Sequence, residues 1–277
     1  MVRAAQMLVV ALVVVMATAA AGADVWQELE TGLEIAHFDS RTRTVSAKGD
    51  LMVLRVEPRI FSLQLLATDR KAGKPGRNVA QWCRDKGLIA AINAGMYQAD
   101  MRTHVGFCQV DGKVINGFAN DYLSVAAFGP VDVADPPFRI FDLDETPMDD
   151  VLRRYRNVVQ NLRLIKRGGE NRWQPATDQW REAALAEDHR GRALLVYCRT
   201  AWSMYEFNEI LLALPLNVVA AQHLEGRSPA RFWIDHPQYK AGPEAPAPGP
   251  ELPNVIGVVR NLDSSNQDSS NKDANEQ

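Results

Sequence analysis

The sequence predicts an α/β (α+β) fold with a mixed β-sheet core and flanking helices. Short apolar stretches bounded by Gly, Pro, Asn and Asp are typical of strands, and the first of them follow one another closely, which favours an antiparallel sheet in that part of the chain. Capping patterns before apolar-periodic segments indicate helices between strands. In the last third, a strand, a helix and a second strand follow one another directly.

The N-terminus has the features of a secretory signal peptide. Met1-Val2-Arg3 supplies a positive charge, an apolar run occupies residues 7–21, and Ala21-Gly22-Ala23 offers a small-residue cleavage site. We expect residues 1–23 to be removed. An uncleaved anchor is the alternative, although the run is short for a membrane span. The mature chain is then exported, to the periplasm or the medium, with no membrane span after cleavage.

The rest of the chain divides into one domain and a tail. Residues 24–260 are long enough to bury a sizeable core, whereas residues 261–277 are almost entirely polar and are predicted to be disordered. The net charge of −3 gives no indication of a nucleic-acid surface. A small-molecule or glycan substrate is the expected partner, and the oligomeric state is left open.

The cysteines and the acidic residues give no metal-site pattern. Cys83, Cys108 and Cys198 are odd in number and lack metal-site spacing, so we expect small core residues, with a single disulfide as the alternative. Residues 142–150 are rich in acids, but Pro147 interrupts them and the calcium-loop pattern is absent. A solvated helix start explains these acids better than calcium does. We expect no cofactor and no obligatory metal.

The predicted elements follow in order. Alternating or apolar β-branched stretches predict strands at residues 33–38, 51–56, 60–67, 88–93, 122–128, 157–165, 193–198, 217–224, 232–234 and 255–259. Asp111-Gly112 predicts a hairpin between residues 106–110 and 113–115. Helices are predicted at residues 79–86 after Asn78, at residues 148–155, and after the capping box that begins at Ser203. Glycine- and proline-rich loops are predicted at residues 71–77 and 240–253.

The apolar strand that ends at Asn93 is the central candidate for a functional site. It stops abruptly at Asn93-Ala94-Gly95, and one large side chain, Tyr97, follows. A buried strand that ends in this way delivers polar groups to the edge of a sheet, where ligands commonly bind. A core strand followed by an ordinary turn is the alternative.

Four segments in order resemble the phosphodiester glycosidase family, which includes a lysosomal uncovering enzyme and exported bacterial proteins. The resemblance covers roughly residues 50–235 and lies in four segments: Asn93-Ala94-Gly95-Met96-Tyr97, Gln160-Asn161-Leu162-Arg163-Leu164, Arg181-Glu182-Ala183-Ala184 and Leu224-Glu225-Gly226. Glu225 stands where the family has aspartate, Arg227 where it has a second glycine, and Glu182 where it has threonine. The resemblance implies the family's mixed α/β fold and cleavage between a sugar's anomeric carbon and a phosphate.

The resemblance and the chemistry of the side chains together indicate candidate catalytic and substrate-binding residues. Glu225 is the acid candidate, since glycosidic cleavage uses carboxylates, and Asn93 is placed to hold a sugar hydroxyl or to orient Glu225. Arg163 and Arg181 suit the departing phosphate. Three further residues are expected to contact substrate: Tyr97, Gly95 and Gly226.

Several of these candidate residues also have an alternative, purely structural interpretation. Glu225 could be a solvated charge, Arg163 could pair with a core carboxylate, and Arg181 follows Trp180 on what could be a loop. His104 is a secondary candidate for proton transfer and substrate contact, as is His223, although a histidine within a strand is more often a core residue.

Two functions remain open at this stage. The first is an exported hydrolase of a sugar-1-phosphodiester or a related envelope glycan. The second is a catalytically lapsed relative that binds glycans or maintains the envelope, which the substitutions at positions 182, 225 and 227 favour. A purely structural envelope component is a weaker third reading.

Overall fold

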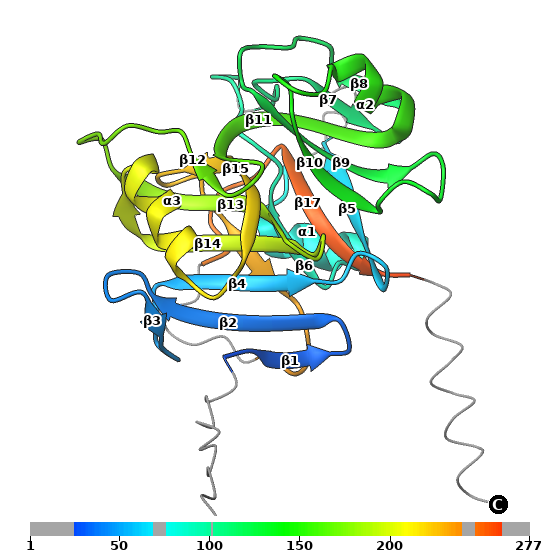
Figure 1. The fold of residues 1–277 in the computed structure, drawn as a ribbon. Coiled ribbons are helices and arrows are strands. Elements are labelled where there is room, and N and C mark those ends of the chain that lie inside the picture. The colour runs from blue at the N-terminus through cyan, green and yellow to red at the C-terminus, as the bar shows by residue number, and fades with distance from the viewer. Residues whose placement is uncertain (1–24, 69–75, 101, 240–246, 262–277) are drawn as a thin grey trace, which may run out of the picture.

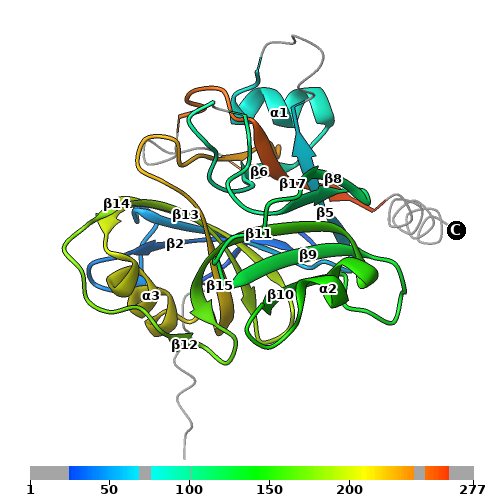
Figure 2. The same ribbon diagram turned by 90° about the horizontal axis from the view of Figure 1, so that it is seen from above.

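Two antiparallel β-sheets stack face to face, and a helix covers the outer face of each (Figures 1 and 2). The computed structural model describes residues 25–68, 76–100, 102–239 and 247–261. The predicted signal peptide and residues 262–277 of the predicted tail lie outside the described residues, as do parts of the two predicted loops.

The larger sheet is built around one long central path of strands. Its order is β1 (Gln27–Glu30), β2 (Leu33–Asp39), β4 (Leu51–Val56), β14 (Ala193–Trp202), β13 (Trp180–Asp188), β15 (Val218–Gly226), β11 (Tyr155–Lys166), β7 (Cys108–Val110) and β8 (Lys113–Asn116). Four strands branch from this path: β3 (Thr44–Val45) on β2, β12 (Glu170–Asn171) and β9 (Ser124–Pro130) on β11, and β10 (Phe138–Asp142) on β9.

The smaller sheet has four strands and lies over the middle of the larger one. Its order is β16 (Phe232–Ile234), β6 (Ala90–Asn93), β17 (Asn254–Arg260) and β5 (Phe61–Ala67). The main core lies between the two sheets, because buried side chains from both enter one cluster, among them Leu54, Leu185, Ile92, Phe232 and Ile256. Apolar side chains packed in this way supply most of the free energy that holds the layers together.

Local sequence signals explain where the helices begin and end. Asn78 caps α1 (Val79–Lys86): its side chain accepts from the Gln81 N–H at 2.9 Å, and Gly87 ends the helix in the left-handed conformation. Ser203 caps α3 (Met204–Ala213) in the same reciprocal way with Glu206. The third helix, α2 (Met148–Arg154), has two acids in its first turn. The structure confirms all three predicted helices.

The helices occupy different layers of the fold. α1 packs Trp82 and Cys83 on the outer face of the smaller sheet, whereas α3 packs Phe207 and Leu211 on the outer face of the larger one. β13 lies between β14 and β15 and pairs with both, so α3 carries the chain across one strand. This connection brings the end of β15 beside the start of β13.

Several details of the predicted fold need correction. Every strand pair formed by the described residues is antiparallel, so the core is not a mixed sheet, and helices are few. Five strands, β1, β3, β10, β12 and β13, were not predicted. Arg181 lies in a strand and not in a loop, and Glu225 lies within β15 and not beyond it.

All three cysteines are buried, and none forms a disulfide. Burial raises the pKa of the Cys83 thiol to about 12, as expected for a small core residue. No helix among the described residues is both long and apolar enough to span a membrane.

Candidate functional site

Asn93 ties the end of β6 to the segment between β15 and β16. Its side-chain Oδ1 accepts from the Arg231 N–H at 2.6 Å, and its Nδ2 donates to the Pro229 carbonyl at 3.2 Å. Asn93 is 1% exposed. Both halves of its amide are therefore occupied in fixing the position of Arg231.

Gly95 lies where the backbone passes against two buried side chains. A Cβ at this position would overlap Asn161 Oδ1 and His104 Cε1. Asn161 also donates to the Ala94 carbonyl at 2.9 Å, from the neighbouring strand β11. The close approach explains why the turn after Asn93 needs glycine.

His104 packs against the turn that contains Gly95. It is buried, its Nε2 lies 2.8 Å from the Gln160 carbonyl, and its Nδ1 lies 3.5 Å from Asn254 Nδ2. Burial lowers the pKa of His104 to about 4, so the imidazole is neutral at pH 7. A position of this kind favours a supporting role over direct contact with substrate.

Glu225 lies near the end of β15, where a β-bulge opposes β13. Its Oε1 accepts from the Gly226 N–H at 2.9 Å. Burial raises the pKa of Glu225, while the Gly226 N–H and His223 oppose the rise. A carboxyl group of this kind can hold or take a proton at a pH closer to neutral than an exposed glutamate can.

Tyr97 and Arg231 complete a cluster around Glu225. The Tyr97 hydroxyl and Arg231 Nε are buried, and neither has a hydrogen-bond partner among the described residues. Burial raises the pKa of Tyr97, and the charge of Glu225 adds to that effect, while Arg231 opposes it. Burial also lowers the pKa of Arg231, and Arg181 contributes to that shift. These four side chains thus lie within electrostatic reach of one another.

A buried acid–imidazole pair accompanies the cluster. His223 Nδ1 lies 2.5 Å from Glu182 Oε1, and Trp180 donates to Glu182 Oε2 at 3.1 Å. The carboxylate of Glu182 raises the pKa of His223, although burial opposes this. Glu182 is therefore already engaged and is not available as a second exposed carboxylate.

Gly226 and Arg227 follow Glu225 at the end of the Leu224-Glu225-Gly226 segment. A Cβ on Gly226 would come 2.8 Å from the Trp180 ring. Arg227 has φ 55, the left-handed conformation that glycine favours, and its guanidinium lies 6.0 Å from the centre of the Trp180 ring. The backbone therefore keeps a glycine-type turn at a position where the side chain is now an arginine.

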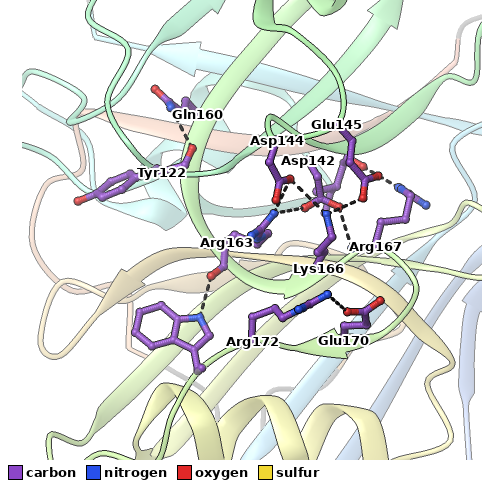
Figure 3. Close-up of polar contacts among 12 residues, drawn as sticks. Tyr122, Asp142, Asp144, Glu145, Gln160, Arg163, Lys166, Arg167, Glu170 and Arg172 are labelled. Atoms are coloured by element: carbon purple, nitrogen blue, oxygen red, sulfur yellow. Dashed lines mark hydrogen bonds and ion pairs between the residues drawn. The ribbon is translucent and has the colours of Figure 1, made fainter.

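Arg163 lies in a different cluster, shown in Figure 3. Its Nη1 pairs with Asp142 at 3.1 Å and with Asp144 at 2.8 Å. Lys166 also pairs with Asp144, and Trp173 donates to the Arg163 carbonyl. No ion pair or hydrogen bond among the described residues joins Arg163 to Glu225. The structure brings Asn93, Gly95, Tyr97, Arg181, Glu225 and Gly226 towards one region. Arg163 lies opposite Gln222 on the neighbouring strand, but its guanidinium is engaged by Asp142 and Asp144.

The sequence alone does not identify two residues of this region, Arg231 and Glu182. Arg231 lies in the segment before β16, and nothing in its local sequence indicates a site. Glu182 was noted only as a departure, because its pairing with His223 depends on how β13 and β15 align. Among the described residues, no three His, Cys, Asp or Glu side chains are grouped as metal ligands.

The family model for phosphodiester glycosidase matches residues 86–259, which is most of the described domain. The chain belongs to the phosphodiester glycosidase family. The match includes β6, β13 and β15, together with the segments that carry Tyr97 and Arg231. No curated protein matches the chain in sequence.

Two solved structures show the same family-type fold. The catalytic domain of zebrafish N-acetylglucosamine-1-phosphodiester alpha-N-acetylglucosaminidase, auto-inhibited by its pro-peptide, is 13% identical with a TM-score of 0.58. The alignment covers 87% of this chain and 85% of that one. A hypothetical protein from Synechocystis is 13% identical with a TM-score of 0.51, over 85% of this chain and 61% of that one. At such identity the likeness concerns the fold.

Proposed function

We propose that this member of the phosphodiester glycosidase family is a hydrolase that cleaves the bond between a sugar's anomeric carbon and a phosphodiester. The observation that carries the proposal is the cluster of Glu225, Tyr97 and Arg231, in which two buried polar groups have no partner in the described chain. Buried donors without partners are costly in a folded protein unless a ligand or water satisfies them.

The proposed chemistry divides the work between the carboxylate and the cations. Water attacks the anomeric carbon, Glu225 takes the proton of that water, and the C–O bond electrons leave with the phosphate monoester. Positive charge that develops on the sugar is stabilised by the Glu225 carboxylate. Arg231 and Arg181 balance the charge of the departing phosphate, and Tyr97 donates a hydrogen bond to the substrate.

Asn93 acts through Arg231 in this proposal. Its amide holds the Arg231 N–H and the Pro229 carbonyl, which makes it a positioning residue. Gly95 and Gly226 allow the backbone to pack closely against Asn161, His104 and Trp180, which fixes the turns that carry the cluster. Because Arg163 is paired with Asp142 and Asp144, we assign it no direct step in the proposed reaction.

The first test is turnover of a panel of sugar-1-phosphodiesters by the mature chain from Asp24. We expect Glu225→Gln to lower kcat by about a hundredfold or more, the scale of acid–base catalysis. Arg231→Ala should have an effect of similar direction, and Arg153→Ala, on the far helix α2, should leave turnover unchanged. Full activity in Glu225→Gln would overturn the assignment.

A lapsed binding protein is the second candidate. Arg227 in place of glycine, and the engagement of Glu182 with His223, favour it. Titration calorimetry with the same panel separates the two: binding without turnover supports the lapsed relative. We further propose export to the periplasm or the medium, supported by the signal-like N-terminal sequence.

A further inference from the structure

A cleft lies at the opposite end of β13 from the candidate site. Its volume is about 320 Å³, and its walls come from β10, from the segment after β11 and from the turn between β13 and β14. Arg181 and Asp188 are seven residues apart on β13, which corresponds to roughly 23 Å along an extended strand. The cleft is therefore separate from the Glu225 cluster.

The lining of this cleft is positively charged, in a protein whose net charge is −3. It contains three arginines and two carboxylates, namely Arg139, Arg167, Arg190, Glu187 and Asp188, for a net charge of +1. Arg192 lies outside the lining, pairs with Asp188 at 2.7 Å and also lies 3.9 Å from Glu34, so these two neighbours together add no net charge to the cleft. His189 also lines the cleft.

Both carboxylates are buried and already satisfied. Glu187 accepts from the Ile140 N–H at 2.8 Å and from Arg167 Nη2 at 2.5 Å. Asp188 accepts from the N–H groups of Arg190 and Arg192 and from the Arg192 guanidinium. These contacts engage the two carboxylates and Arg167, so they do not neutralise the remaining arginines.

Two guanidinium groups remain available to a ligand. The nearest carboxylate oxygen to Arg139 Nη1 is that of Glu187, at 3.9 Å, which is too long for a hydrogen bond. The exposed Arg190 side chain forms no ion pair with any described residue. Guanidinium groups match phosphate oxygens because they donate two parallel hydrogen bonds.

We propose that this cleft binds a phosphate group, with Arg139 and Arg190 as its donors. The volume is large enough for a phosphate that carries a further substituent, such as a sugar. This inference does not depend on the proposed hydrolysis, because it concerns residues at the other end of the sheet.

The test is a titration of ¹⁵N-labelled protein with inorganic phosphate and, separately, with a sugar phosphate. We expect the backbone amides of residues 188–191 to shift with saturation. The double variant Arg139→Ala/Arg190→Ala should bind about tenfold more weakly or worse, because it loses two charge-assisted contacts. Arg153→Ala, which removes an exposed charge on α2, is the matched control.

The outcome of these titrations decides whether the cleft binds phosphate and in which form. Binding at residues 188–191 that persists in Arg231→Ala but fails in the double variant supports the cleft. Absence of binding by both probes, or equal binding by the double variant, overturns it. If the double variant does not fold, Arg190→Glu replaces it, because this substitution alters only the exposed turn residue. Arg190→Glu should also weaken phosphate binding. Tighter binding of the sugar phosphate than of inorganic phosphate identifies an esterified ligand, and the reverse identifies the free anion.

Discussion

Gly95 shows how one residue without a side chain shapes the candidate site. Its backbone lies against Asn161 and His104, both of which are buried. We expect Gly95→Ala to lower the free energy of unfolding by about 2 kcal/mol, the scale of overpacking in a filled core. Urea denaturation measures this, and Gly117→Ala is an informative comparison because a Cβ there comes no closer than 3.6 Å to another side chain. An unchanged midpoint for Gly95→Ala would contradict the close approach.

Because His104 is buried and neutral in the folded protein, we expect the free energy of unfolding to fall at acidic pH. Its pKa is lowered to about 4 in the folded protein, against about 6.5 for an unperturbed histidine. Above pH 6.5 both states are neutral and the residue contributes no pH dependence. As pH falls from 6.5 to 4, the unfolded state takes up the proton first, so the free energy of unfolding declines by about 3 kcal/mol.

The control for this prediction is His104→Gln. Glutamine does not titrate, so the variant should lose that part of the decline between pH 6.5 and 4, whatever its stability at pH 7. The measurement is the free energy of unfolding of both proteins at half-unit pH steps. Parallel curves would show that His104 is not the group responsible.

The site residues that follow the end of β6 could be predicted from the sequence. Asn93, Gly95 and Tyr97 follow an apolar run that stops abruptly, and this pattern is visible in a short window. Arg231 was not predictable, because the residue that positions it, Asn93, is 138 residues away in the chain. Arg163 has the right chemistry but is paired with Asp142, and sequence does not reveal such pairing.

At the scale of elements, α3 depends on its capping box. The Glu206 N–H donates to Ser203 Oγ at 3.3 Å, and the Ser203 N–H donates to Glu206 Oε2 at 3.0 Å. Ser203→Ala should reduce the free energy of unfolding by about 1 kcal/mol, which corresponds to a fall of roughly 2–4 °C in Tm for a domain of this size. Ser203→Thr keeps the acceptor and should lose much less. Thermal melts of the two variants provide the comparison.

Helices and most strands were predictable because their signals are local. β10 was missed because it is only five residues long and ends in the acid-rich stretch that reads as a helix start. β13 was missed because its Ala, Leu and Glu residues do not have strand propensity, and pairing on both sides with β14 and β15 decides its conformation. Pairing partners far apart in the chain also decide that the sheets are antiparallel.

For the whole molecule, the stacked sheets imply a single cooperative unit. The core between them contains fully buried side chains from both, including Leu185 and Leu195 of the larger sheet and Ile92, Phe232 and Ile256 of the smaller one. Burial of one such side chain is worth about 1.5–3 kcal/mol. Separation of the sheets would expose all of them, so neither sheet should persist without the other.

Six tryptophans allow a direct test of this cooperativity. Trp82 and Trp233 pack with α1 and the smaller sheet, whereas Trp26, Trp173, Trp180 and Trp202 pack on the outer side of the larger sheet. In a urea titration of protein labelled with 5-fluorotryptophan, we expect the native ¹⁹F signals to disappear at one common midpoint. Phe232→Ala, which opens a cavity between the sheets, should move all six signals to lower urea together, since it weakens the shared core. Earlier loss of the Trp82 and Trp233 signals alone would show that the smaller sheet unfolds independently, and that the strand carrying Asn93 can separate from the strand carrying Glu225.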